Sequence, residues 1–223
     1  SVQYAYMLSG NSCYVPRVAA CNVLMGTYCV PDCSQNHYDR YEHEGWVPPK
    51  NIFVWGNNPL VSNADGNLGH WVVDCMKRGS KLIVMDPTLT WVAGKEDVFL
   101  QVRPGTDAAL ALALCNQIIE DGLEDKEFID LWCYGFDELA ERAKEFDVKR
   151  VSEITWVPEE KIIAAARMLG NAKNSTLQWG VAFDQTKWAN GTAHAAVAVQ
   201  ALTGNIDNPG GEFVGQPADP NSV

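Results

Sequence analysis

The sequence predicts an α/β fold, with a doubly wound, mainly parallel sheet and helices on both of its faces. From Asn51 onward, short apolar runs typical of buried strands alternate with amphipathic helical segments. Most of these runs end at glycine, proline or aspartate, which favour turns. The chain has 223 residues, 47% of them hydrophobic, which is enough to bury a substantial core.

Four segments are expected to form the sheet. Each is short and largely apolar, as expected of a strand that is buried on both faces. Strands that are joined through helices run in the same direction, so we expect these four to be parallel neighbours in one sheet. The expected strands span residues 51–55, 81–85, 98–102 and 175–179.

Six helices are expected between and after these strands. The first ends at Gly79, a residue that often follows a helix. The second begins near Asp107, whose charge suits the positive end of the helix dipole. Pro158 is typical of the first turn of a helix and marks the start of the fifth expected helix. The expected helices lie around residues 68–79, 106–122, 126–132, 137–146, 158–170 and 191–202.

The chain is expected to have three parts. Residues 1–50 have weak periodicity, and we expect one or two helices and a long loop there. Residues 51–215 form the predicted cofactor-binding domain, and residues 216–223 a tail. Because the sequence begins at Ser1 without a signal-peptide pattern and ends in that tail, we expect a piece of a longer polypeptide.

Composition excludes two classes of partner. With 17 basic and 28 acidic residues the net charge is −11, which argues against nucleic-acid binding. No apolar run approaches the roughly 20 residues of a membrane span.

The seven cysteines are odd in number, which argues against a disulfide framework. A zinc site at Cys29, Cys33 and His37 is disfavoured by their spacing.

Polar, glycine-containing clusters follow all four predicted strands. In a parallel sheet, ligands bind beyond the carboxyl ends of the strands, so we expect a nucleotide-sized site at this edge. The candidate residues are Gly56, Asn57, Asn58 and Pro59 after the first strand, Asp86 and Pro87 after the second, Pro104, Gly105, Thr106 and Asp107 after the third, and Gly180 and Gln185 after the fourth.

The residue types indicate the ligand. Neither the dinucleotide fingerprint G-x-G-x-x-G nor a P-loop is present. A carboxylate can accept two N–H bonds from the edge of a guanine, and glycines let the backbone approach a diphosphate. The alternative interpretation is that Asp86 and Asp107 only cap helices.

Four motifs follow one another between residues 51 and 211, namely Trp55–Pro59, Gly79–Pro87, Pro104–Leu110 and Thr203–Gly211. In this order and spacing they resemble the molybdopterin oxidoreductases of the dimethyl-sulfoxide-reductase family. This resemblance implies a Rossmann-like domain of a large catalytic subunit. Such subunits bind two molybdopterin guanine dinucleotides around one molybdenum or tungsten atom.

The resemblance also implies roles for the strand-end residues. The loop after the first strand and the Asp86 loop would hold the diphosphate and ribose of one dinucleotide, Asp107 would read the guanine, and Gln185 would lie toward the pterin. Three residues depart from the family pattern, and the first puts one phosphate contact in doubt. The departures are Thr88, Ala182 and Asp207.

A metal ligand is expected near the N-terminus. The run from Cys13 to Ala20 is similar to the family's cysteine or selenocysteine ligand together with the segment that follows it. Cys13 is therefore the predicted ligand, because a thiolate suits a soft metal, and Arg17 would stabilise it or bind an anionic substrate. A buried structural cysteine is the alternative role, and Cys21 is the second candidate ligand.

The resemblance implies partners that lie outside these residues. They are the remaining domains of the subunit, an iron–sulfur cluster, an iron–sulfur electron-transfer subunit and a small-molecule substrate. We expect the isolated piece to be inactive. Two other classes stay open: a metal-free relative such as the large iron–sulfur subunit of respiratory NADH dehydrogenase, and the central domain of thiamine-diphosphate enzymes.

Overall fold

A four-stranded parallel sheet forms the centre of the computed structural model, which describes residues 15–27, 29–31, 40–42, 44–62 and 67–214. The strands are β2 (Asn51–Trp55), β3 (Lys81–Met85), β4 (Val98–Leu100) and β5 (Ser175–Trp179), in the order β4-β3-β2-β5. The predicted parallel sheet is therefore confirmed, with β4 two residues shorter than expected.

Alternate side chains of the strands enter two separate cores, as the two-residue period of a strand requires. Ile52 and Val54 of β2 pack into a small core, with Trp71 and Cys75 of α4 (Asn67–Lys77). The core on the other face is larger and takes Phe53 and Trp55. The short helix α3 (Pro59–Ser62) and the turn η3 (Ala93–Lys95) lie on the side of α4. Helices thus cover both faces of the sheet, as predicted.

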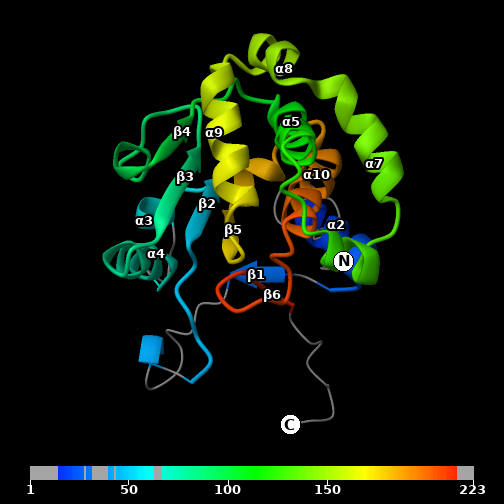
Figure 1. The fold of residues 1–223 in the computed structure, drawn as a ribbon. Helices are drawn as coiled ribbons and strands as arrows, with labels where there is room; N and C mark the ends of the chain where they lie inside the picture. The colour runs from blue at the N-terminus through cyan, green and yellow to red at the C-terminus, as the bar shows by residue number, and fades with distance from the viewer. Residues whose placement is uncertain (1–14, 28, 32–39, 43, 63–66, 215–223) are drawn as a thin grey trace, which may run out of the picture.

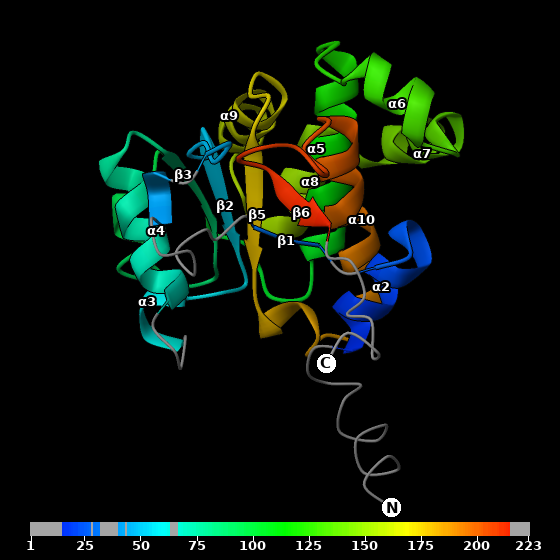
Figure 2. The ribbon, with the colours of Figure 1, turned by 90° about the horizontal axis from the view of Figure 1, so that it is seen from below.

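Three long helices cover the larger core. They are α5 (Asp107–Glu120), α9 (Glu159–Gly170) and α10 (Ala189–Leu202), and α5 contacts both of the others. Alanines face inward on α10, which lets α2 (Val15–Met25) pack closely against it. α2 is a helix in the segment where one or two were expected. Figure 2 shows α2 and α10 side by side.

Three short helices extend from this layer. α6 (Lys126–Trp132) and α7 (Phe136–Ala143, continued by η4, Lys144–Phe146) confirm the two predicted acidic helices. α8 (Val148–Thr155) was not predicted. Asp147 marks its start, because the carboxylate accepts a 2.9 Å hydrogen bond from the backbone N–H of Arg150.

A second, two-stranded antiparallel sheet pairs β1 (Cys29–Pro31) with β6 (Glu212–Val214). Neither strand was predicted, because three residues carry no readable alternation. The side chain of Glu212 fastens β6 to the open edge of β5. Its Oε1 accepts hydrogen bonds from Thr176 Oγ1 at 2.9 Å, Gln200 Nε2 at 3.1 Å and the backbone N–H of Leu177.

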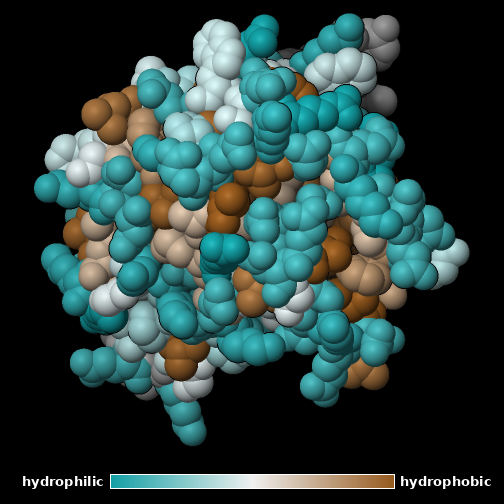
Figure 3. Space-filling view, turned by 45° about the horizontal axis from the view of Figure 1, so that its top comes forward, coloured by the Kyte–Doolittle hydropathy of each residue, from teal (hydrophilic) through white to brown (hydrophobic). Residues whose placement is uncertain are grey.

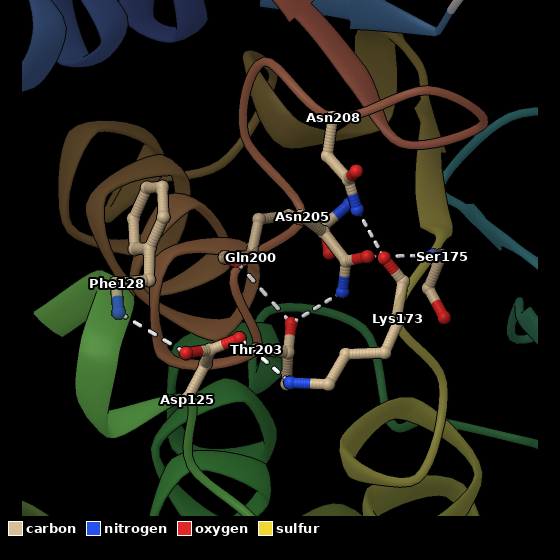
Figure 4. Close-up of polar contacts among 8 residues, drawn as sticks. All are labelled: Asp125, Phe128, Lys173, Ser175, Gln200, Thr203, Asn205 and Asn208. Carbon is tan, nitrogen blue, oxygen red and sulfur yellow. Dashed lines mark hydrogen bonds and ion pairs between the residues drawn. The ribbon is translucent and has the colours of Figure 1, made fainter.

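The Thr203–Gly211 motif lies at the amino end of β5, away from the strand-end loops. Asn205 Oδ1 accepts a 2.7 Å hydrogen bond from the backbone N–H of Ser175, and Asn205 Nδ2 donates to Thr203 Oγ1 at 2.6 Å. Asn208 donates to the carbonyl of Lys173 (Figure 4). In this structure the motif anchors the start of β5.

On the face drawn in Figure 3, apolar side chains lie among many polar ones. The most exposed large apolar side chains of the described residues include Trp132 at 77% and Tyr134 at 102%. Within the described residues, no helix has the length and apolar character needed to cross a membrane.

Candidate functional site

The loops that follow the strands meet at one edge of the sheet, at the lower end of the strands in Figure 2. Three hydrogen bonds continue the strand pairing into these loops. The backbone N–H of Gly56 donates to Met85 O at 3.2 Å, that of Gly180 donates to Trp55 O at 3.1 Å, and that of Asp86 donates to Leu100 O at 3.3 Å. The first residues after β2, β3 and β5 are therefore neighbours, as the sequence indicated.

Glycines allow the loops after β2 and β5 to touch. Gly56 has φ +59°, a conformation that L side chains rarely adopt. A Cβ on Gly180 would lie 2.5 Å from Gly56 O and 2.6 Å from Asn57 Cβ, so no larger residue fits there. The methyl group of Ala182 already fills the space beside Gly56. These glycines shape the edge through contact between loops.

Asp107 is held by a buried tryptophan. A turn precedes it, in which Gly105 has φ +84° and the N–H of Thr106 donates to Arg103 O at 3.2 Å. Asp107 is the first residue of α5, and its Oδ1 accepts a 3.0 Å hydrogen bond from Trp55 Nε1. Trp55 is fully buried at the end of β2. The bond orients the carboxylate at the strand-end edge.

Asp86 stabilises the loop that follows β3 by accepting hydrogen bonds from a residue of that loop. Its Oδ1 accepts hydrogen bonds from the backbone N–H of Thr88 at 2.8 Å and from Thr88 Oγ1 at 2.7 Å. Thr88, which departs from the family pattern, therefore supports Asp86 in this structure. Pro87 is exposed, and its carbonyl accepts a 3.1 Å hydrogen bond from Gln101 Nε2.

The side chain of Asn58 carries an acceptor that has no partner among the described residues. Its backbone carbonyl accepts from the N–H groups of Val61 and Ser62 at 3.0 and 2.8 Å, which starts α3. Its side-chain Oδ1 is buried and, among the residues that the structure describes, accepts no hydrogen bond. Buried polar atoms are nearly always paired, so an acceptor at this edge suits a donor from a ligand.

A buried ion pair joins α2 to the loop after β5. Arg17 Nε donates to Asp184 Oδ2 at 2.8 Å, and Arg17 Nη1 donates to the carbonyl of Trp179 at 3.2 Å. The backbone N–H of Arg17 donates to Asp184 Oδ1 at 3.2 Å. The side chains are 9% and 0% exposed. The pair fixes the start of α2 beside the strand-end edge, while neighbouring Gln185 is exposed.

A cavity of about 540 Å³ opens beside this pair, between the start of α2 and the segment that leads into α10. Cys13 lies outside the described residues, two positions before α2 begins, so its predicted role as ligand is untested. Cys21 is fully buried in the larger core. In the described part of the chain, no three His, Cys, Asp or Glu side chains cluster as metal ligands. The cavity is lined by Val15, Pro16, Ala19, Thr186, Lys187, Trp188, Ala189, Asn190 and Gly191.

Sequence reasoning missed two contacts at this edge. Asp184 belongs to the polar residues that follow the fourth predicted strand, but its pairing with Arg17 was not predicted. Trp55 was treated as a strand residue, although an indole N–H needs an acceptor when it is buried.

The fold and this edge define a doubly wound α/β domain with polar and glycine-bearing loops at the carboxyl ends of its strands. The family model of molybdopterin oxidoreductases matches residues 13–216, so the chain belongs to that family.

Comparisons with individual proteins support this family assignment. Acetylene hydratase of Syntrophotalea acetylenica is 42% identical over 142 residues, covering 64% of this chain and 19% of that protein. Dimethyl sulfoxide reductase DmsA of Haemophilus influenzae is 31% identical over 186 residues, covering 73% and 23%. The solved structure of acetylene hydratase from Pelobacter acetylenicus aligns with a TM-score of 0.81 and 31% identity, over 93% of this chain and 26% of that one. The chain thus spans about a fifth to a quarter of these relatives.

The family implies a molybdopterin cofactor with molybdenum or tungsten, and the strand-end edge fits part of such a group. Such a group offers N–H donors, and this edge presents the carboxylates of Asp107 and Asp86 and the Oδ1 of Asn58. Each carboxylate has one oxygen engaged within the protein and a second oxygen that accepts no hydrogen bond from the described residues.

Proposed function

We propose that this chain is the part of a molybdopterin-dependent catalytic subunit that binds one molybdopterin guanine dinucleotide, and that Cys13 supplies a ligand to the metal. The observation that carries the proposal is the hydrogen bond between Trp55 and Asp107 at the strand-end edge. It holds an acidic acceptor in one orientation, which selective recognition of a base edge requires.

In this proposal, different residues contact different parts of the nucleotide. Asp107 accepts N–H bonds from guanine with Oδ2 and the remaining lone pair of Oδ1, and Asp86 accepts from ribose. The backbone around Gly56 and Gly180 lies against the diphosphate, and Gln185 reaches toward the pterin. The bound cofactor supplies the metal and its redox chemistry, and the protein supplies position and electrostatics.

Arg17 serves the metal-ligand segment in this proposal by holding it in place. Its guanidinium bonds to Asp184 and to the carbonyl of Trp179, which ties the first turn of α2 to the end of β5. Cys13 lies four residues before Arg17 in the sequence, so in this proposal the ion pair fixes the start of the helix that follows the ligand. A thiolate there suits a soft metal.

The whole subunit is expected to act on a small molecule and to need its remaining domains and an iron–sulfur partner. The relatives named above are acetylene hydratases and a dimethyl sulfoxide reductase.

Guanine recognition can be tested on this chain by calorimetric titration with GDP. Asp107→Asn keeps an oxygen for Trp55 but replaces an acceptor with an amide donor. We expect it to keep the wild-type melting temperature and to weaken GDP binding by at least about tenfold, since a hydrogen bond to a charged group contributes about 1.5–3 kcal/mol.

Asp130→Asn on exposed α6 is the matched control and should bind GDP as the wild type does. A wild-type chain that does not bind GDP, or an Asp107→Asn chain that binds it equally well, would refute the assigned guanine site.

A further inference from the structure

Trp156 occupies a strained position beside the turn that leads to Asp107. Its backbone has φ +67°, and it ends α8 by donating its N–H to Ser152 O at 2.9 Å. Glycine is the residue that normally takes this conformation at a helix end, because a side chain crowds the backbone there. Among the described non-glycine residues only Trp156 and Asp207 have positive φ.

Packing does not explain the choice of tryptophan. Trp156 is 69% exposed, so its indole buries little apolar surface in this chain. A strained backbone that carries an exposed aromatic ring lowers the stability of the fold, and such features are typically kept because they serve a function.

Arg103 connects this ring to the proposed guanine site. Its guanidinium carbon lies 5.1 Å from the centroid of the Trp156 ring, and its backbone N–H donates to Thr155 O at 2.8 Å. Its carbonyl accepts from Thr106 N at 3.2 Å and from Thr106 Oγ1 at 2.7 Å. Arg103 is thus the first residue of the turn that ends next to Asp107. Within the described chain, its guanidinium pairs with no carboxylate.

We propose that Trp156 and Arg103 form a stacking surface for the purine base whose edge Asp107 reads. The inference rests on the proposed function, because it requires a nucleotide at this turn. Indole rings and guanidinium planes both stack on bases, and such stacking tolerates any base. Asp107 would then select guanine, while the Trp156–Arg103 pair would add affinity.

The strain makes the proposal testable, because Trp156→Gly should relieve it. We expect this variant to melt at or above the wild-type temperature, by up to about 2–4 °C. Its GDP affinity, measured by calorimetry, should nevertheless fall by about tenfold or more, which corresponds to about 1.4 kcal/mol. Arg103→Ala should weaken GDP binding in the same direction.

Two further variants separate stacking from a structural effect. Trp156→Phe keeps an aromatic ring and should restore most of the affinity lost in Trp156→Gly. Trp132→Ala removes another largely exposed indole, on α6, and should leave GDP affinity unchanged. The wild type should also show quenching of tryptophan fluorescence by GDP that is smaller in Trp156→Phe.

The outcomes separate this inference from the proposed function. A Trp156→Gly chain that binds GDP as the wild type does, or whose affinity and melting temperature fall together, overturns the stacking surface alone. The same holds if Trp156→Phe fails to restore binding. Absence of GDP binding by the wild type overturns the guanine site itself, and the stacking surface with it.

Discussion

Glu212 is predicted to make this chain less stable as the pH rises. Its side chain is buried, and Oε1 accepts three hydrogen bonds, whereas Oε2 has no partner among the described residues. Burial raises the pKa of this carboxyl from 4.5 to about 7, although the three hydrogen bonds act in the opposite direction.

The sign of the effect follows from proton linkage. The folded state holds the proton up to about pH 7, whereas the unfolded chain releases it near pH 4.5. The free energy of unfolding therefore falls as the pH rises from about 4.5 to 7 and is then constant. A difference of about 2.5 pKa units, at about 1.4 kcal/mol each, corresponds to about 3 kcal/mol.

Glu212→Gln removes the ionisation and keeps an oxygen for the donors on β5 and α10. We expect the variant to gain about 2–3 kcal/mol of unfolding free energy relative to the wild type between pH 5 and pH 8. Urea denaturation followed by circular dichroism at several pH values measures this difference. Glu153→Gln, on the exposed side of α8, is the control for loss of one carboxylate.

The dependence on pH is the decisive result, because a constant offset between the two chains could come from small changes in hydrogen bonding. The difference in unfolding free energy between the two chains could stay constant with pH, or the wild type could gain stability relative to the variant as the pH rose. Either result would refute the prediction that Glu212 is neutral in the folded chain.

Three other predictions concern the strand-end edge. Gly180→Ala should lower the unfolding free energy by about 1–3 kcal/mol in urea titrations, because its Cβ would lie 2.5 Å from a backbone oxygen of the neighbouring loop; a stable variant would refute that close approach. Asp184→Ala should cost about 3–5 kcal/mol by removing one partner of a buried ion pair, and removal of both residues should cost less than the sum of the single changes. In the full-length subunit, Cys13→Ala should abolish turnover while pterin content, measured after extraction, stays unchanged, and Cys21→Ala should keep activity. An active Cys13→Ala enzyme would exclude this cysteine as the ligand.

The order of elements was readable from sequence because the signals are local. The runs at 51–55 and 81–85 are apolar, short and closed by turn residues, and both formed strands. The helix at 107–120 combined an apolar stripe with an acidic first turn. Parallel direction followed from the helical connections, so the meeting of the strand-end loops was also predictable.

The contacts that shape the site were decided by tertiary structure. Trp55 and Asp107 are 52 positions apart, and Arg17 and Asp184 are 167 apart. No spacing rule links residues at such distances, because they meet only after the sheet and its helices have packed. The pairing of β1 with β6 has the same origin. Local pattern thus determined which segments became strands and helices, while packing decided which side chains met, since a buried donor or charge takes the partner that the fold brings within reach.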